Sequence, residues 1–90
     1  MFEVRIGSRA QKGIKRLDPK MLKLVLECLK VLEENPVPAK NYNVKKVEGV
    51  DFIYRIRIQY MRIKYGVLWN EKTIEIYKIE RKKDRTYKQQ

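Results

Sequence analysis

The segment that decides the fold runs from Tyr54 to Tyr65 and reads YRIRIQYMRIKY. Apolar and basic residues alternate on both sides of a short break, which is the pattern of two half-buried β-strands joined by a tight turn. Because alternate side chains of a strand point to the same face, Arg55 and Arg57 would lie side by side. Adjacent like charges repel each other on a sheet, so this pair indicates a surface that meets an anionic ligand.

Each strand of this hairpin, expected at residues 52–58 and 61–68, has one apolar set of alternate side chains and one polar set. The apolar sets suit a face that packs against a core. The polar sets carry Arg55, Arg57, Arg62 and Lys64. We therefore expect the three arginines to converge on the open face of a sheet.

Two helices are expected upstream, after a first strand at residues 2–6. A Ser-x-x-Gln capping box that begins at Ser8 predicts a helix to about residue 17. Asp18 followed by Pro19 predicts the start of a second helix, with the aspartate as its N-cap. Pro36 disfavours helical geometry in the residue before it, so this helix is expected to end there.

Two further strands, expected at residues 44–47 and 73–79, bring the order of elements to β-α-α-β-β-β-β. Grouped helices and strands joined by short turns are typical of an α+β domain with an antiparallel sheet. The helical hairpin would cover one face of the sheet and leave the other face free. A chain of 90 residues without internal repeats is expected to form one domain, residues 1–90.

The chain is strongly basic, with 22 Lys and Arg against 11 Asp and Glu and a formal net charge of +11. Such an excess favours polyanionic partners, namely nucleic acid, an anionic membrane surface or an acidic protein. The alternative reading is a solvated charged surface of the kind found in thermophilic proteins.

Several kinds of chemistry are not expected. The single cysteine, Cys28, cannot form an internal disulfide, and the chain has no histidine. A metal site, a histidine-based nucleophile and a bound cofactor are therefore not predicted. The sequence contains no signal peptide and no apolar stretch long enough to span a bilayer, so we expect a cytoplasmic protein without a membrane partner.

The C-terminal segment ERKKDRTYKQQ, residues 80–90, extends the basic character. Arginine binds phosphate through two parallel hydrogen bonds, and tyrosine stacks on exposed bases. The candidate RNA-binding residues outside the arginine cluster are Lys64, Lys82, Lys83, Arg85 and Lys88. The alternative is a solvated basic tail whose tyrosine packs on the core.

Three segments together resemble the RelE toxins of the RelE/ParE superfamily, and archaeal members in particular. They are LEENPVP at residues 32–38, VEGVDFIYRIRIQYMRIKYGV at residues 47–67, and the closing arginine and tyrosine at Arg81 and Tyr87. With the predicted order of elements, the resemblance covers nearly the whole chain.

The resemblance implies a toxin of a type II toxin–antitoxin system that cleaves mRNA in the ribosomal A site and stops translation. The implied reaction is attack of a ribose 2′-hydroxyl on the adjacent phosphate, which leaves a 2′,3′-cyclic phosphate and a 5′-hydroxyl. The implied partners are mRNA, the ribosome and an acidic RelB-like antitoxin. The implied catalytic residues, matched by position, are Arg55, Arg57, Arg62, Arg81 and Tyr87.

Two positions depart from the family pattern. Gln59 and Tyr60 replace a turn that usually contains glycine, and position 57 is arginine where well-known members have lysine. Arginine stays charged and does not accept a proton, so the general base is left open among Tyr87, water and the ribosome. Two alternatives also stay open: a ParE-like toxin that poisons DNA gyrase, and a non-catalytic RNA- or ribosome-binding module.

Overall fold

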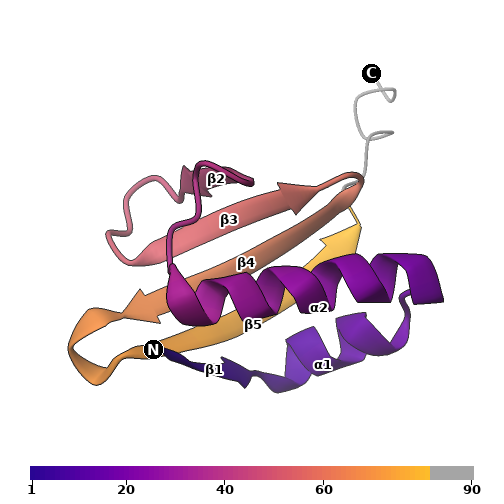
Figure 1. The fold of residues 1–90 in the computed structure, drawn as a ribbon, viewed down its shortest axis with the longest axis horizontal. Coiled ribbons are helices and arrows are strands. Elements are labelled where there is room, and N and C mark those ends of the chain that lie inside the picture. The colour runs from indigo at the N-terminus through magenta and orange to yellow at the C-terminus, as the bar shows by residue number, and fades with distance from the viewer. Residues whose placement is uncertain (82–90) are drawn as a thin grey trace.

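The computed structural model describes residues 1–81 as a two-layer α+β fold, in which two helices cover one face of a five-stranded sheet (Figure 1). The sheet order is β1-β5-β4-β3-β2. The elements, in chain order, are β1 (Glu3–Ile6), α1 (Ser8–Lys15), α2 (Pro19–Glu34), β2 (Asn43–Lys46), β3 (Ile53–Ile58), β4 (Met61–Leu68), a short 3-10 turn (Trp69–Glu71) and β5 (Thr73–Arg81). The predicted class and element order are confirmed.

The helix starts agree with the sequence at α2 and differ at α1. Asp18 caps α2, because its carboxylate accepts a 2.8 Å hydrogen bond from the backbone N–H of Met21. The predicted capping box is wrong, since Ser8 is already the first residue of α1 and makes no capping hydrogen bond. The amide of Gln11 instead donates to the carbonyl of Ile6, 2.8 Å away, and so ties α1 back to β1.

The sheet is antiparallel except at one edge. Strands β2, β3, β4 and β5 pair antiparallel in sequence order, as expected from their short connections. β1 differs because it lies parallel to β5, with Glu3 opposite Thr73. The two helices form the long connection that a return in the parallel direction requires.

Two tight turns have left-handed backbone angles at residues other than glycine. In the turn between β3 and β4, Gln59 adopts a φ of 53°. In the turn before β5, Lys72 adopts a φ of 50°. Neither turn contains glycine, so both depend on the flanking strand pairs to hold a conformation that costs a non-glycine residue free energy.

The core lies between the helices and the sheet. Its members alternate along the strands and recur every three or four residues along α2, as the sequence predicted. Tyr65 is fully buried, and its hydroxyl donates a 2.8 Å hydrogen bond to the carbonyl of Pro36. This bond fastens the loop after α2 to the centre of the sheet. No helix within residues 1–81 is long and apolar enough to cross a membrane.

β5 contains an irregularity that decides which way its last residues point. Tyr65 pairs with Ile76, but the preceding Lys64 pairs with Lys78, which leaves Tyr77 without a partner on β4. One strand therefore carries an extra residue, which is the signature of a β-bulge. The strand also runs two residues further than predicted, to Arg81.

The bulge reverses the alternation of side chains along β5. Ile76 and Ile79, three residues apart, are both buried on the helix side. Tyr77 lies on the opposite side, where its hydroxyl occupies the space beside Gly66 of β4. Lys78 lies on that side as well, and Arg81 falls on the side of Ile79.

α1 covers the edge of β5 beyond the end of β1. Gly13 of α1 packs directly on the backbone of Ile79, so closely that a side-chain carbon at position 13 would overlap the Ile79 carbonyl oxygen. A glycine is needed here because any side chain at position 13 would meet the backbone of β5. The contact brings the exposed face of α1 to the end of the sheet.

Candidate functional site

Four cations form a row across the open face of the sheet. Arg55 of β3 is in register with Lys45 of β2 on one side and with Lys64 of β4 on the other. Lys64 is in turn in register with Lys78 of β5. Side chains directly opposite on neighbouring strands lie close enough to interact. The row therefore places four positive charges side by side without an intervening carboxylate.

A second row lies one step further along the strands. Arg57 of β3 pairs with Asn43 of β2 and with Arg62 of β4, and Arg62 pairs with Glu80 of β5. This row contains two arginines between an amide and a carboxylate. Together the two rows form what we call the open-face site, defined by Asn43, Lys45, Arg55, Arg57, Arg62, Lys64, Lys78 and Glu80.

Two hollows in the open-face site share Arg55 and Arg62. One hollow, of about 180 Å³, also involves Arg57, Lys45 and Asn43. The other, of about 170 Å³, is lined in addition by Val47, Lys64, Lys78 and Glu80. The expected convergence of Arg55, Arg57 and Arg62 on the open face is confirmed.

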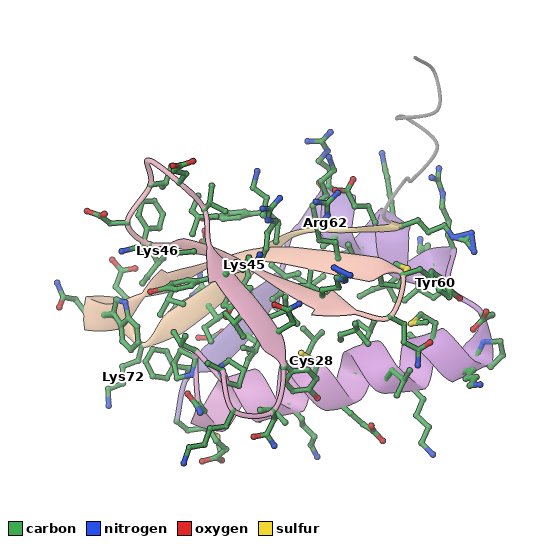
Figure 2. The ribbon with its side chains drawn as sticks, turned by 90° about the horizontal axis from the view of Figure 1, so that it is seen from above. Cys28, Lys45, Lys46, Tyr60, Arg62 and Lys72 are labelled. Carbon is green, nitrogen blue, oxygen red and sulfur yellow. The ribbon has the colours of Figure 1, made fainter. Side chains whose placement is uncertain are left out.

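Arg62 is the least accessible of the ion-paired arginines, with 30% of its side chain exposed. It lies on the side of the sheet away from α2 (Figure 2). Its Nε atom is shielded from solvent and makes no hydrogen bond within the described residues. The nearest carboxylate oxygen, Oε2 of Glu80, is 4.0 Å away, which counts as an ion pair but is too long for a hydrogen bond. Arg62 therefore keeps donor capacity for an anionic ligand.

Glu80 is the carboxylate of the open-face site. Its Oε1 atom lies 3.2 Å from Nζ of Lys78, and its Oε2 atom faces Arg62. Both partners are partly exposed, so these pairs contribute little stability. The two ion pairs also leave the site positively charged, because Glu80 is one carboxylate among six cations.

Arg81 does not join the other three predicted arginines. It is in register with the buried Met61 on the helix side of the sheet. Its guanidinium lies over the ring of Tyr60, 4.7 Å from the ring centroid. The bulge in β5 is the physical reason, because it turns Arg81 away from the open face. A catalytic role for Arg81 stays a prediction, and the described residues do not bring it to Arg62.

Of the remaining predicted residues, one lies in the described part of the chain and the others lie beyond residue 81. Lys64 lies in the open-face site, as expected from its strand position. The others fall in the tail, outside the described residues 1–81, and their predicted roles stay untested: Lys82, Lys83, Arg85, Tyr87 and Lys88.

Four residues of the open-face site were not predicted: Asn43, Lys45, Lys78 and Glu80. The alternation around Val44 would have placed Asn43 and Lys45 on the open face, had β2 been paired with β3 in advance. The signal for Lys78 and Glu80 was weaker, namely the change of isoleucine spacing from two to three between Ile74, Ile76 and Ile79.

The residues with strongly shifted pKa values lie in the core. Burial raises the pKa of the Cys28 thiol to about 12, although a hydrogen bond with Tyr42 acts in the opposite direction. Burial also raises the pKa of Tyr65. Among residues 1–81, no group of three His, Cys, Asp or Glu residues could hold a metal ion. The open-face site thus offers cationic donors, which can bind a phosphate and stabilise negative charge that develops on it.

A search of curated proteins finds a relative in Methanocaldococcus jannaschii, named "Putative toxin RelE1", with 40% identity over 81 residues and 90% of each chain covered. Among solved structures, the RelE chain of the archaeal RelE–RelB complex from Pyrococcus horikoshii matches with a TM-score of 0.84 and 30% identity, over 92% of this chain and 97% of that chain. The isolated Escherichia coli RelE toxin shares the fold, with a TM-score of 0.80 and 17% identity over 99% and 94% of the two chains. A scan against protein-family models finds no match.

The fold and the basic open face define a small α+β protein of the RelE type. The M. jannaschii relative extends the likeness from the fold to the sequence along most of the chain. The chain therefore belongs to the RelE toxin family of toxin–antitoxin systems.

Proposed function

We propose that this protein is an endoribonuclease that cleaves mRNA on the ribosome, with the open-face site as its phosphate-binding centre. The observation that carries the proposal is the register of β3 and β4, which sets Arg57 opposite Arg62 and Arg55 opposite Lys64. A ParE-like gyrase poison would not need this set of cations.

The reaction matches the chemistry of the site. The 2′-oxygen of a ribose forms a bond to the adjacent phosphorus, the bond from phosphorus to the 5′-oxygen breaks, and that oxygen takes up a proton. The products are a 2′,3′-cyclic phosphate and a 5′-hydroxyl. Extra negative charge would build on the phosphate oxygens in the transition state, and Arg62, whose Nε–H donor has no partner within residues 1–81, would stabilise it.

The proton of the 2′-hydroxyl needs an acceptor. Arg55, Arg57 and Arg62 stay charged and do not serve as one. The 2′-hydroxyl proton is proposed to pass to Tyr87, to water or to a group of the ribosome, and the 5′-oxygen would take up a proton from water or the same group. The ribosome is also proposed to hold the 2′-oxygen in line with the phosphate, and such positioning removes much of a barrier. Free RNA would therefore be a poor substrate.

We further propose an acidic RelB-like antitoxin as the partner that silences this toxin. The RelE of P. horikoshii was solved in complex with RelB. The net charge of +11 favours rapid association with an acidic chain.

The test is to incubate the protein with translating ribosomes and a defined mRNA, and to map the new RNA ends by primer extension. The proposal predicts cuts in the codon of the A site, termini with a 2′,3′-cyclic phosphate, and little cleavage of the same RNA without ribosomes. Binding to ribosomes without cleavage would indicate a non-catalytic module instead. Efficient cleavage of free RNA would show that the ribosome is not needed.

A further inference from the structure

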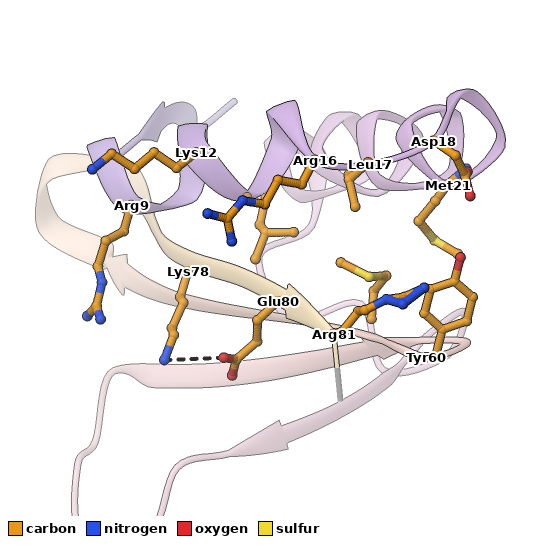
Figure 3. Close-up of a pocket in the computed structure, with 13 residues that line it drawn as sticks. Arg9, Lys12, Arg16, Leu17, Asp18, Met21, Tyr60, Lys78, Glu80 and Arg81 are labelled. Carbon is orange, nitrogen blue, oxygen red and sulfur yellow. Dashed lines mark hydrogen bonds and ion pairs between the residues drawn. The ribbon is translucent and has the colours of Figure 1, made fainter. Parts of the chain in front are cut away.

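A third hollow borders the open-face site at Lys78 and Glu80. It is a groove of about 530 Å³ between α1 and the neighbouring ends of β4 and β5, which we call the α1 groove (Figure 3). Its floor is apolar, because Met21, Met61 and Ile79 are each at most 4% exposed. The floor belongs to the core and would stay in place when a ligand binds.

The rim of the α1 groove is cationic. Arg9, Lys12 and Arg16 follow one another at spacings of three and four, so they line one side of α1 (Figure 3). Within residues 1–81, none of these three cations has a carboxylate oxygen within 4.0 Å. Asp18 also lines the groove, but its carboxylate is engaged as the cap of α2. The rim therefore carries charge that the fold itself does not neutralise.

A cation–π pair lies at one end of the α1 groove. The guanidinium of Arg81 lies 4.7 Å from the centroid of the Tyr60 ring, and both residues line the groove (Figure 3). Tyr60 is 41% exposed, although it belongs to the large apolar residues. The left-handed φ of Gln59 forms the tight turn that carries the ring at this position. An exposed ring next to a guanidinium plane is a surface on which a nucleobase can stack.

The α1 groove continues into the open-face site. Lys78 and Glu80 line both the groove and the hollow that contains Arg55 and Arg62. A strand of RNA whose phosphate is bound at Arg62 could thus pass over the edge of β5 and reach α1. The two sites would then contact neighbouring nucleotides of one chain.

We propose that the α1 groove binds an unstacked nucleotide of single-stranded RNA, with its base on the exposed ring of Tyr60 beside Arg81 and its phosphate against Arg16 and Lys12. Stacking planes combined with a basic rim are the features by which proteins hold single strands. An acidic protein segment would match the charge, but it would not need the exposed ring of Tyr60 or the continuity with Arg62. The inference takes its ligand class from the proposed function, while the groove itself is a separate site.

The first test measures binding by fluorescence anisotropy. The probe is a labelled RNA of about six nucleotides, 2′-O-methylated throughout so that it cannot be cleaved. Tyr60→Ala should weaken binding about 10-fold, because stacking of one base contributes about 1–3 kcal/mol. Tyr60→Phe keeps the ring and should bind like the wild type. Arg16→Gln should weaken binding and lower the salt slope by about 0.7, the value for one phosphate contact on a single strand.

The matched control is Lys23→Gln, which removes an exposed cation of α2 that lines neither the groove nor the open-face site. It should leave affinity and salt slope nearly unchanged. Equal affinity of the wild type, Tyr60→Ala and Arg16→Gln would overturn the proposal. The proposal would also be overturned if Lys23→Gln lost as much affinity as Arg16→Gln. It would be overturned as well if the wild type did not bind the probe at low salt. None of these results depends on cleavage, so the proposed nuclease activity can fail or hold independently.

A second test separates the two possible sources of the RNA. Cleavage on ribosomes is compared for the wild type and Tyr60→Ala, with a full-length mRNA and with one that ends directly after the A-site codon. If mRNA downstream of the A-site codon fills the groove, the defect of Tyr60→Ala should disappear with the shortened message. If the groove binds a nucleotide of the A-site codon itself or ribosomal RNA, the defect should be the same with both messages. No defect with either message, together with unchanged binding of the probe, would overturn the proposal.

Discussion

Arg62 combines two properties that rarely occur together at a surface ion pair. Its Nε atom is shielded from water, yet the facing carboxylate of Glu80 is 4.0 Å away and accepts no hydrogen bond from it. A shielded donor without a partner costs free energy. A phosphate oxygen at this position would remove that cost, which is the physical reason to regard Arg62 as the centre of the open-face site.

Cys28 leads to a prediction about alkaline pH. Burial raises the pKa of its thiol from about 9 in the unfolded chain to about 12 in the folded protein. Between these values the unfolded chain releases a proton that the folded protein keeps. The free energy of unfolding should therefore fall as the pH rises above about 9, by at most about 1.4 kcal/mol per pH unit from this group.

Urea unfolding of the wild type and Cys28→Ala, from about pH 8 to about pH 10, measures this effect. Burial also raises the pKa values of Tyr42, Tyr65 and Tyr77, but these residues are present in both proteins. The difference between the two proteins thus reports the cysteine together with its interactions with Tyr42 and Tyr65, whose pKa values Cys28 also raises. Parallel pH dependence in both would show that the thiol does not stay protonated in the fold.

At the scale of elements, three features were not predicted from the sequence, and all three involve β5. The helices, the strands and the apolar faces follow from local patterns, such as Asp18-Pro19 and the alternation around Tyr54. The parallel pairing of β1, the bulge at Tyr77 and the packing of Gly13 on Ile79 arise from tertiary contacts. A pattern read along a single segment does not contain them.

Gly13→Ala tests this contact. Alanine favours an isolated helix by about 1 kcal/mol over glycine. Here its methyl group would overlap the carbonyl oxygen of Ile79, so α1 would have to move away from β5. We expect the free energy of unfolding to fall by about 1–3 kcal/mol, the usual cost of overpacking.

Lys15→Ala is the control for Gly13→Ala, because Lys15 is exposed on the same helix. It should change stability by no more than about 0.5 kcal/mol. Both variants can be compared by urea unfolding of the whole chain. A Gly13→Ala protein as stable as the wild type, or more stable, would show that α1 does not depend on this close approach.

At the scale of the whole molecule, the residues that hold the fold together and the cations of the open-face site lie on opposite faces of the sheet. The apolar face holds the sheet to the helices, while the opposite face gathers six cations around one carboxylate. The sequence predicted this division, and it predicted Arg55, Arg57 and Arg62 on the open face. It did not predict the separation of Arg81, because the bulge that turns β5 is visible only as a change in isoleucine spacing.

The charge of the whole molecule predicts how a RelB-like partner should behave. Coexpression with an acidic antitoxin encoded beside the toxin should give a complex that copurifies and does not cleave mRNA. The complex should weaken as salt is raised, because its association is driven in part by opposite charges. Analytical size exclusion at increasing salt measures this. Affinity that does not change with salt would indicate that apolar contacts, not the basic surface, hold the antitoxin.

The proposed function requires that the open-face site stabilises the phosphate that is cut on the ribosome. The most direct measurement is the single-turnover rate of mRNA cleavage on ribosomes for the wild type, Arg62→Ala and the control Arg5→Ala. Arg5 is an exposed arginine of β1 that pairs with Glu3 and lies outside the site. Arg62→Ala should lower the rate about 10²–10³-fold, which is the usual loss when one transition-state donor is removed. Arg5→Ala should cleave like the wild type. Both variants should remain folded. A folded Arg62→Ala protein that cleaves at the wild-type rate would show that the open-face site does not stabilise the phosphate that is cut.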